Sequence, residues 1–330
     1  MKVRDEAFQY YFYFMQERMN IFWKRYEGIT NNFTNDKILA VNKFTNVYRA
    51  QDRTSQYLIQ EVIYGDRIYD DCDVLFRILF FKIFNNIDTW IYLQDELGDI
   101  KISNFDVDVI TRLLANRIKF RPIFSGAYMM TGSHSKYVEY PSKHEKWMQM
   151  LKREIVVARR LERIIEANSL KEVFEILSEC SFIGSFLAYQ YAIDLNYSEV
   201  IDFDENSFVR AGIGAIRGIK KCFTDIDRYS FEACIRFTQE NLESFQQKYG
   251  YTSFRPLFSR NPTLIDLQNC FCETDKYLRV KLPELQVDNM RIKQKFQKPK
   301  APIQFFFPPK WNINQYVQPC TSNTKELTLF

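Results

Sequence analysis

Apolar side chains recur along most of this chain at the three- and four-residue spacing of amphipathic helices. Glycine and proline are sparse, at 10 each, so few positions interrupt that spacing. We therefore predict an all-α fold. The expected helical stretches are 8–25, 36–64, 74–97, 106–118, 143–165, 170–177, 231–249 and one that begins at 262–266.

Two of these stretches carry charged faces. In 8–25, Arg18 and Arg25 belong to the expected polar side of an aromatic-rich helix. In 36–64, Asn46, Arg49 and Arg53 fall opposite the apolar face. That stripe suits phosphate contacts, but it equally suits a solvated face with an ion pair between Arg49 and Asp52.

A short turn, 182–185, separates two helical stretches. Gly184 within it permits a tight, left-handed backbone, and the amides that follow, from Ser185 onward, form an anion site suited to a DNA phosphate. A plain helix–helix corner is the alternative.

An acidic cluster follows that turn, with Asp204 twenty residues after Gly184 and with Asp202 and Glu205 beside it. An acid at such a position commonly caps a helix. A carboxylate near a phosphate-binding turn also suits the stabilisation of an oxocarbenium-like sugar during cleavage of an N-glycosidic bond.

Three glycines, 212, 214 and 218, have the wrong spacing for a dinucleotide-binding fingerprint, and no strand precedes them. We expect them to permit close packing or the approach of a nucleotide. Arg217, Lys220 and Lys221 are the phosphate contacts expected beside them.

The amino-acid composition limits the kinds of metal, cofactor and thiol chemistry to expect. Seven scattered cysteines without a CxxC pair indicate reduced thiols, and with only two histidines we expect no metal site and no cofactor. The net charge of +4 neither requires nor excludes nucleic acid. The N-terminus lacks signal-peptide features and no apolar run is long enough to span a bilayer, so we expect a cytoplasmic protein.

The composition changes after residue 289. Basic and aromatic residues alternate with prolines and no acid occurs between 290 and 325, which predicts an extended arm over 290–330. Residues 1–289 are expected to form a single domain with lobes of about 1–165 and 166–289.

Several motifs taken together resemble a known family. They are 43–49 with Asp52 and Arg53, 124–128, 186–190, 204–206, 214–218 and 266–277. The chain resembles the α-glutamyl/putrescinyl thymine pyrophosphorylase family, which is also seen as the helical domain of hydroxymethyluracil DNA kinases. The segment from the 182–185 turn to Asp204 is similar to the core of the helix-hairpin-helix DNA glycosylases.

The resemblance implies a glycosylase-like fold that acts on modified bases in double-stranded DNA, without a membrane or an evident protein partner. It implies a catalytic role for Asp204, with Asp202 and Glu205 as alternatives. Glycosylases with lyase activity carry lysine where this chain has Phe186, so a monofunctional hydrolase is expected. The residues implied for the base pocket are Asn46, Arg49, Arg53, Tyr128, Gln190, Glu273 and Lys276.

Three functions follow as hypotheses. The first is a DNA glycosylase that flips out and excises a hypermodified pyrimidine of phage DNA, in anti-phage defence. The second is a transferase that acts on pyrophosphorylated hydroxymethyl-thymine. The third is a DNA-binding module without catalysis, which would show salt-sensitive binding through its basic arm.

Overall fold

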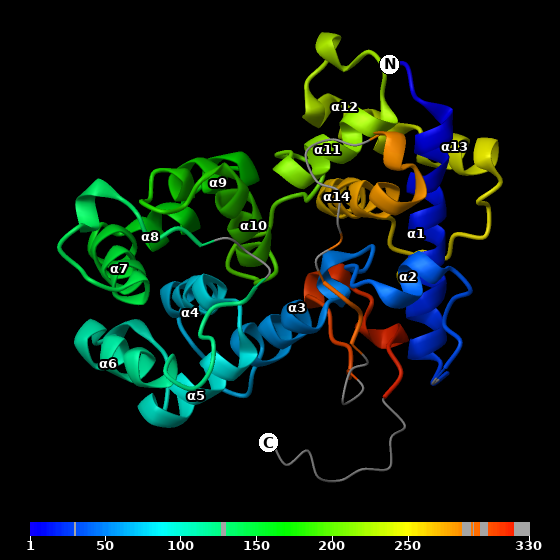
Figure 1. The fold of residues 1–330 in the computed structure, drawn as a ribbon. Coiled ribbons are helices and arrows are strands. Elements are labelled where there is room, and N and C mark those ends of the chain that lie inside the picture. The colour runs from blue at the N-terminus through cyan, green and yellow to red at the C-terminus, as the bar shows by residue number, and fades with distance from the viewer. Residues whose placement is uncertain (30, 127–129, 286–291, 293, 298–302, 320–330) are drawn as a thin grey trace. The chain divides into compact units, whose positions relative to one another are not determined.

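A computed structural model describes residues 1–29, 31–126, 130–285, 292, 294–297 and 303–319 (Figure 1). Within these ranges the regular structure is helical and only isolated β-bridges occur, which confirms the all-α prediction. The α-helices are α1 (Asp5–Tyr26), α2 (Lys37–Val41), α3 (Arg53–Tyr57), α4 (Asp71–Phe84), α5 (Ile87–Leu97), α6 (Val107–Arg117), α7 (Lys143–Met150), α8 (Arg160–Ile165), α9 (Leu170–Ser178), α10 (Ser185–Leu195), α11 (Ile213–Cys222), α12 (Phe231–Glu240), α13 (Leu242–Tyr249) and α14 (Leu264–Lys281).

The chain divides into two compact units. Unit 1 comprises Met1–Gln56 with Ala211–Phe330, and unit 2 comprises Tyr57–Arg210. The domain and lobe boundaries expected at 165 and 289 stay a prediction. In the described part of the chain, no helix is both long and apolar enough to cross a membrane.

The core of unit 1 lies where α1 and α11 pack on α14 (Figure 1). Aromatic rings fill this contact: Tyr11 of α1 lies 4.3 Å from Phe271 of α14, measured between ring centroids, and Phe8 contacts Phe223 at 5.2 Å. The Tyr11 hydroxyl also donates to the Leu267 carbonyl at 3.1 Å. Large buried rings thus join helices that lie at opposite ends of the sequence.

Two glycines allow α11 to approach α14 closely. A Cβ at Gly218 would lie 2.0 Å from the Phe271 carbonyl oxygen, and one at Gly214 would lie 2.3 Å from Cys272 Sγ. Residue 218 cannot be larger without moving a helix, because the clash is with backbone, whereas a larger residue at 214 would require the Cys272 side chain to move. Close helix packing therefore explains these two glycines.

Unit 2 contains α4 to α10, and α4 packs on α10. A fully buried ion pair joins these two helices, with Lys82 Nζ 3.3 Å from Asp194 Oδ2. Lys82 also donates to Asn85 Oδ1 at 2.7 Å. Each residue of this pair requires the other, because removal of one charge leaves the other buried and unpaired.

Four expected helical stretches are interrupted, and one of them, 74–97, divides between α4 and α5 at Asn85, which has a φ of 47°. The stretch 36–64 contains α2, an irregular segment, α3 and a π-helix, η2 (Leu58–Ile63). The stretch 143–165 breaks at Arg159, which has a φ of 53°, and 231–249 divides between α12 and α13 at Asn241. Helical periodicity alone did not reveal these breaks, because apolar residues keep their spacing across each of them.

The described part of the C-terminal segment, 303–319, contains two 3-10 turns, η8 (Pro309–Trp311) and η9 (Asn314–Tyr316). Phe307 is buried, and the Phe306 amide donates to Gln56 Oε1 at 2.8 Å. The aromatic side chains of this segment therefore anchor it to unit 1.

Candidate functional site

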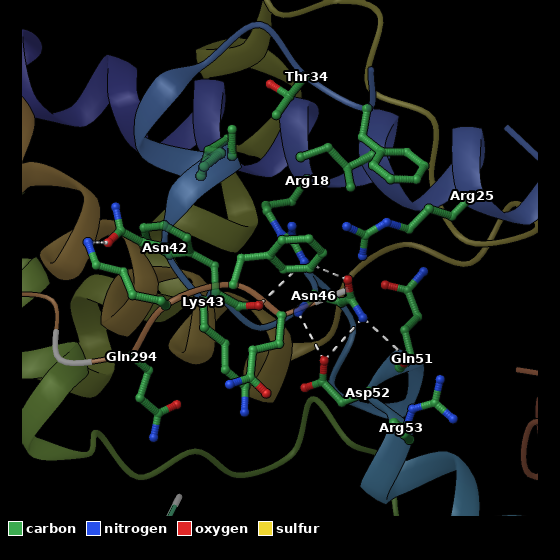
Figure 2. Close-up of a pocket in the computed structure, with 18 of the residues that line it drawn as sticks. Arg18, Arg25, Thr34, Asn42, Lys43, Asn46, Gln51, Asp52, Arg53 and Gln294 are labelled. Atoms are coloured by element: carbon green, nitrogen blue, oxygen red, sulfur yellow. Dashed lines mark hydrogen bonds between the residues drawn. The ribbon is translucent and has the colours of Figure 1, made fainter. Parts of the chain in front are cut away.

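One pocket of unit 1 has a volume of about 1000 Å³. It opens between α1, α2, the segment 42–54 and the segment 294–297 (Figure 2). Its wall is mainly cationic and amide-bearing. The polar residues that matter most below are Arg18, Arg25, Lys43, Asn46, Asp52 and Arg53.

A hydrogen-bonded chain runs through this wall from Arg18 to Asp52 (Figure 2). Arg18 Nη2 donates to Asn46 Oδ1 at 2.8 Å, and its Nε donates to the Thr45 carbonyl at 3.0 Å. The Asn46 amide Nδ2 then donates to Asp52 Oδ1 at 3.1 Å, as does the Asn46 backbone amide. Asn46 is thereby held in one orientation between a cation and an acid.

The protonation of this chain is shifted by its surroundings. Burial raises the pKa of Asp52 to about 6, against the lowering effect of the Asn46 amide and of Arg18. Burial lowers the pKa of Arg18 to about 10, with nearby Arg25 acting in the same direction. Asp52 therefore titrates close to neutral pH, while Arg18 stays charged.

A second chain of contacts supports the same wall from α14. The Thr45 amide donates to Glu273 Oε2 at 3.1 Å, and Lys276 Nζ lies 2.6 Å from Glu273 Oε1. Burial alone would lower the pKa of Lys276, but the charge of Glu273 raises it above its ordinary value. This partly buried ion pair holds Glu273 in place against the backbone next to Asn46.

Aromatic rings flank one cation of the pocket. The Arg25 guanidinium carbon lies 4.5 Å from the Phe33 ring centroid and 5.0 Å from that of Phe296. Both rings line the pocket, and burial lowers the pKa of Arg25. A flat ligand with a negative charge would find both stacking surfaces and donors here.

Most of the residues that the family resemblance implied for a base pocket lie in or beside the pocket of unit 1. Asn46 and Arg53 line the pocket, while Glu273 and Lys276 support it from behind. Arg49 is buried beside it, and its backbone amide donates to Asp266 Oδ1 at 3.0 Å.

Two more members of that set lie elsewhere. Gln190 is buried on α10 in unit 2, and Tyr128 lies outside the described residues. Their roles stay a prediction.

The prediction that Arg18 lies on an exposed polar face is wrong, since Arg18 lines the pocket. It was expected on a polar face, yet only 6% of it is exposed, because its guanidinium turns inward to the carbonyls of Phe44 and Thr45. Asp52 was expected as the ion-pair partner of Arg49 and as part of a motif that carries the family resemblance, and not as a pocket residue.

The 182–185 turn leads into α10, with Gly184 at its N-cap. The left-handed residue is Phe182, with a φ of 69°, whereas Gly184 has a φ of −75°. The expected reason for glycine at 184 is therefore wrong. Ser185 begins α10 and is exposed, so its amide stands at the helix N-terminus, and phosphate binding there stays a prediction.

The acidic cluster lies in an irregular loop of unit 2. Asp204 is exposed and its Oδ1 accepts the Asn206 amide at 2.9 Å, which forms a local turn. No helix begins there, since α11 starts at Ile213, so Asp204 is not a helix cap. Asp202 is exposed, and Glu205 is 7% exposed.

The three basic residues expected to contact phosphates all lie on α11. Lys220 is exposed and Arg217 is partly buried. Lys221 is 1% exposed, and its Nζ lies 2.9 Å from Asp275 Oδ1 inside unit 1. A buried ion pair of this kind supports a structural role for Lys221.

Comparison with known proteins identifies related sequences. The family described as "5-hmdU DNA kinase, helical domain" matches residues 5–287. The 5-hmdU DNA kinase of Bacillus phage SP10 is 24% identical over 284 residues, which cover 81% of this chain and 44% of that protein. The chain thus spans less than half the length of this relative. No solved structure matches it.

These findings correct the expected activity. The family and the phage relative are both described as a kinase, so the prediction of a hydrolase that excises a base is wrong, and the anti-phage glycosylase function falls with it. The resemblance to the helical domain of hydroxymethyluracil DNA kinases is confirmed. The relationship to helix-hairpin-helix glycosylases stays a prediction.

Proposed function

Because the chain belongs to the family of 5-hmdU DNA kinase helical domains, we propose that it binds DNA and holds a 5-hydroxymethyluracil nucleotide in the pocket of unit 1. The observation that carries this proposal is the chain of hydrogen bonds from Arg18 through Asn46 to Asp52. It presents fixed donors and acceptors in a pocket that is otherwise aromatic and cationic.

The chemistry of the base fits these groups. Uracil offers one N–H donor between two carbonyl acceptors, and its hydroxymethyl group both donates and accepts. An ionised Asp52 only accepts, and each of its oxygens can take more than one hydrogen bond. It suits the N–H or the hydroxyl of the base, while the Arg18 guanidinium supplies donors for the carbonyls. Asn46, whose side-chain amide donates to the Gln51 carbonyl and to Asp52 Oδ1, holds Asp52 in place.

The rim of the pocket fits the rest of the nucleotide. Lys43 and Arg53 line it, and Arg53 is exposed, so their charges suit the phosphates on either side of an extruded base. Phe33, Phe44 and Phe296 offer ring surfaces against which such a base can stack.

We assign substrate recognition to this chain. The sequence contains no G-x-x-x-x-G-K-[ST] loop, the usual cradle of the nucleoside triphosphate in P-loop kinases. The phosphoryl transfer named for the phage relative is therefore proposed to need groups outside the pocket described above. Asn46 and Asp52 would orient the hydroxymethyl group for that transfer.

The test is an affinity comparison between duplexes that carry 5-hydroxymethyluracil or thymine at one position. We expect the modified duplex to bind about tenfold more tightly, which corresponds to ~1.4 kcal/mol. Asn46→Ala should remove the preference, whereas Arg53→Gln should weaken both duplexes equally.

The matched control is Asn116→Ala, at an exposed position on α6, which should change neither value. Circular dichroism and thermal unfolding verify that each variant is folded. Equal affinity of the unaltered protein for both duplexes, or a preference that survives Asn46→Ala, would exclude the proposal.

A further inference from the structure

A second pocket of unit 1 has a volume of about 570 Å³. It is lined by Trp23 of α1, by the segment 255–260 and by Trp311 to Tyr316 of the C-terminal segment. It shares no lining residue with the first pocket. Four aromatic residues and two arginines are among the residues that line it, and none of those described is an acid.

The backbone of the turn 257–260 is strained. Phe258 and Ser259 have φ values of 47° and 68°, which side-chain-bearing residues seldom adopt, and the Arg260 amide closes the turn on the Leu257 carbonyl at 2.9 Å. Turns with two such residues normally use Asn-Gly. The bulky Phe258 at this position is therefore unusual.

The buried hydroxyl of Tyr48 holds this turn from both ends. It accepts the Leu257 amide at 3.2 Å and donates to the Arg260 carbonyl. Strained backbone that is fixed in this way is often found where a side chain must be presented to a ligand. Here the turn presents Phe258 and Arg260 to the pocket.

Each arginine of the pocket is stacked on a tryptophan. The Arg255 guanidinium carbon lies 3.8 Å from the Trp23 ring centroid, and that of Arg260 lies 4.0 Å from Trp311. Glu27 neutralises part of this charge, since its Oε1 lies 2.6 Å from Arg255 Nη1. Stacking fixes the orientation of the two guanidinium planes.

Tyr316 supplies an open aromatic surface. It lines the pocket with 57% of the residue exposed, at the end of η9. Its carbonyl accepts the Tyr26 hydroxyl at 3.5 Å, and its amide donates to the Ile313 carbonyl at 3.0 Å. The backbone is thus tied to α1 while the side chain stays available for stacking.

We propose that this second pocket binds one nucleotide of an unpaired DNA strand, with its base stacked on Tyr316 and its phosphate bound by Arg260. An aromatic platform beside a fixed guanidinium is the combination that single-strand sites use, and it needs no particular base. A base can leave the duplex only where the two strands separate. The inference rests on the proposed function and adds to it a contact with unpaired DNA next to the extruded base.

The test measures binding of labelled, unmodified oligothymidylate to the whole protein. Tyr316→Ala should weaken binding about tenfold, and Tyr316→Phe should retain it, because stacking needs the ring and not the hydroxyl. Arg260→Gln should weaken binding and lower the slope of log affinity against log salt by about one. Exposed Tyr229, changed to alanine, and exposed Arg228, changed to glutamine, are the matched controls.

Full affinity in both Tyr316→Ala and Arg260→Gln would overturn the proposal. So would binding of free thymidine monophosphate that equals that of the oligonucleotide, because the site would then serve a free nucleotide. Loss of affinity in the controls as well would also overturn it. Preference for 5-hydroxymethyluracil is read in a separate assay, so failure here is distinguishable from failure of the first pocket.

Discussion

Asp52 is the residue whose ionisation is most sensitive to its place in the pocket. Its pKa is raised from 3.8 to about 6 because burial disfavours the charged carboxylate. Between these values the folded protein binds more protons than the unfolded chain. The contribution of Asp52 to stability is therefore largest below pH 3.8 and declines as pH rises toward about 6.

Asp52→Asn tests this directly. Asparagine keeps an acceptor for the Asn46 amides but carries no charge, so the variant should be more stable than the unaltered protein above pH 6, on the order of 1 to 3 kcal/mol. Below pH 3.8 the difference should vanish. Urea unfolding of both proteins across this range measures it, and a difference that is independent of pH would contradict the assignment.

The sequence indicated part of the pocket wall. Asn46 and Arg53 were expected to contact phosphates from one helical face, and the family resemblance implied a base pocket for them; both line the pocket of unit 1. The inward turn of Arg18 was not predictable, because it depends on the Phe44 and Thr45 carbonyls, which face α1 only once the chain leaves the helical conformation there. The support from Glu273 joins residues that are 228 positions apart.

At the scale of elements, the close contact between α11 and α14 requires that residue 218 has no side chain. Gly218→Ala would place a Cβ against the Phe271 carbonyl, and we expect a loss of more than about 3 kcal/mol in the free energy of unfolding. Gly184→Ala is the control, since its Cβ would meet nothing within 4 Å, and the cost should stay below about 1 kcal/mol. Similar losses in the two variants would show that helix contact is not the cause.

Asp36 joins three helices. Its Oδ1 caps α2 through the amides of Ile38 and Leu39, while Oδ2 accepts the hydroxyls of Tyr13 on α1 and Tyr277 on α14. Burial raises the pKa of Asp36, but these hydrogen bonds outweigh it and lower the pKa below 3.8. The stability that the carboxylate confers is present above pH 3.8 and is lost as pH falls through the lowered value.

We expect Asp36→Ala to cost about 2 to 4 kcal/mol at neutral pH, from the lost cap and the two unpaired tyrosine hydroxyls. Asp36→Asn keeps an acceptor and should cost less. Chemical unfolding at neutral and acid pH measures both, and the cost of the alanine change should shrink in acid. A cost that grows in acid would contradict the role of the carboxylate.

Helical periodicity predicted the limits of a helix correctly where the helix has a single apolar face and its backbone hydrogen bonds stay within the helix. α1 and α6 begin and end within a few residues of the predicted limits, and α14 begins within the predicted 262–266. The prediction was wrong for 36–64, because backbone groups of that stretch bond to distant side chains such as Glu273 instead of continuing a helix. Local spacing carries no information on such partners.

At the scale of the molecule, charge is nearly balanced, with 45 basic and 41 acidic residues. The proposed binding of DNA therefore depends on where cations gather, and the pocket wall of unit 1 brings together Arg18, Arg25, Lys43 and Arg53. Each phosphate that such a cation contacts releases counterions, so affinity should fall linearly with salt on logarithmic scales.

Arg25→Gln should lower that slope by about one if Arg25 contacts a phosphate in the bound state. Arg163 of unit 2 is the matched control, because its guanidinium is already paired with Glu179 at 2.8 Å on an exposed surface. Arg163→Gln should leave the slope unchanged. Fluorescence anisotropy over a salt series gives both slopes, and a uniform loss of affinity without a change in slope would show that Arg25 acts on the neighbouring Phe33 and Phe296 rings instead of on the phosphate.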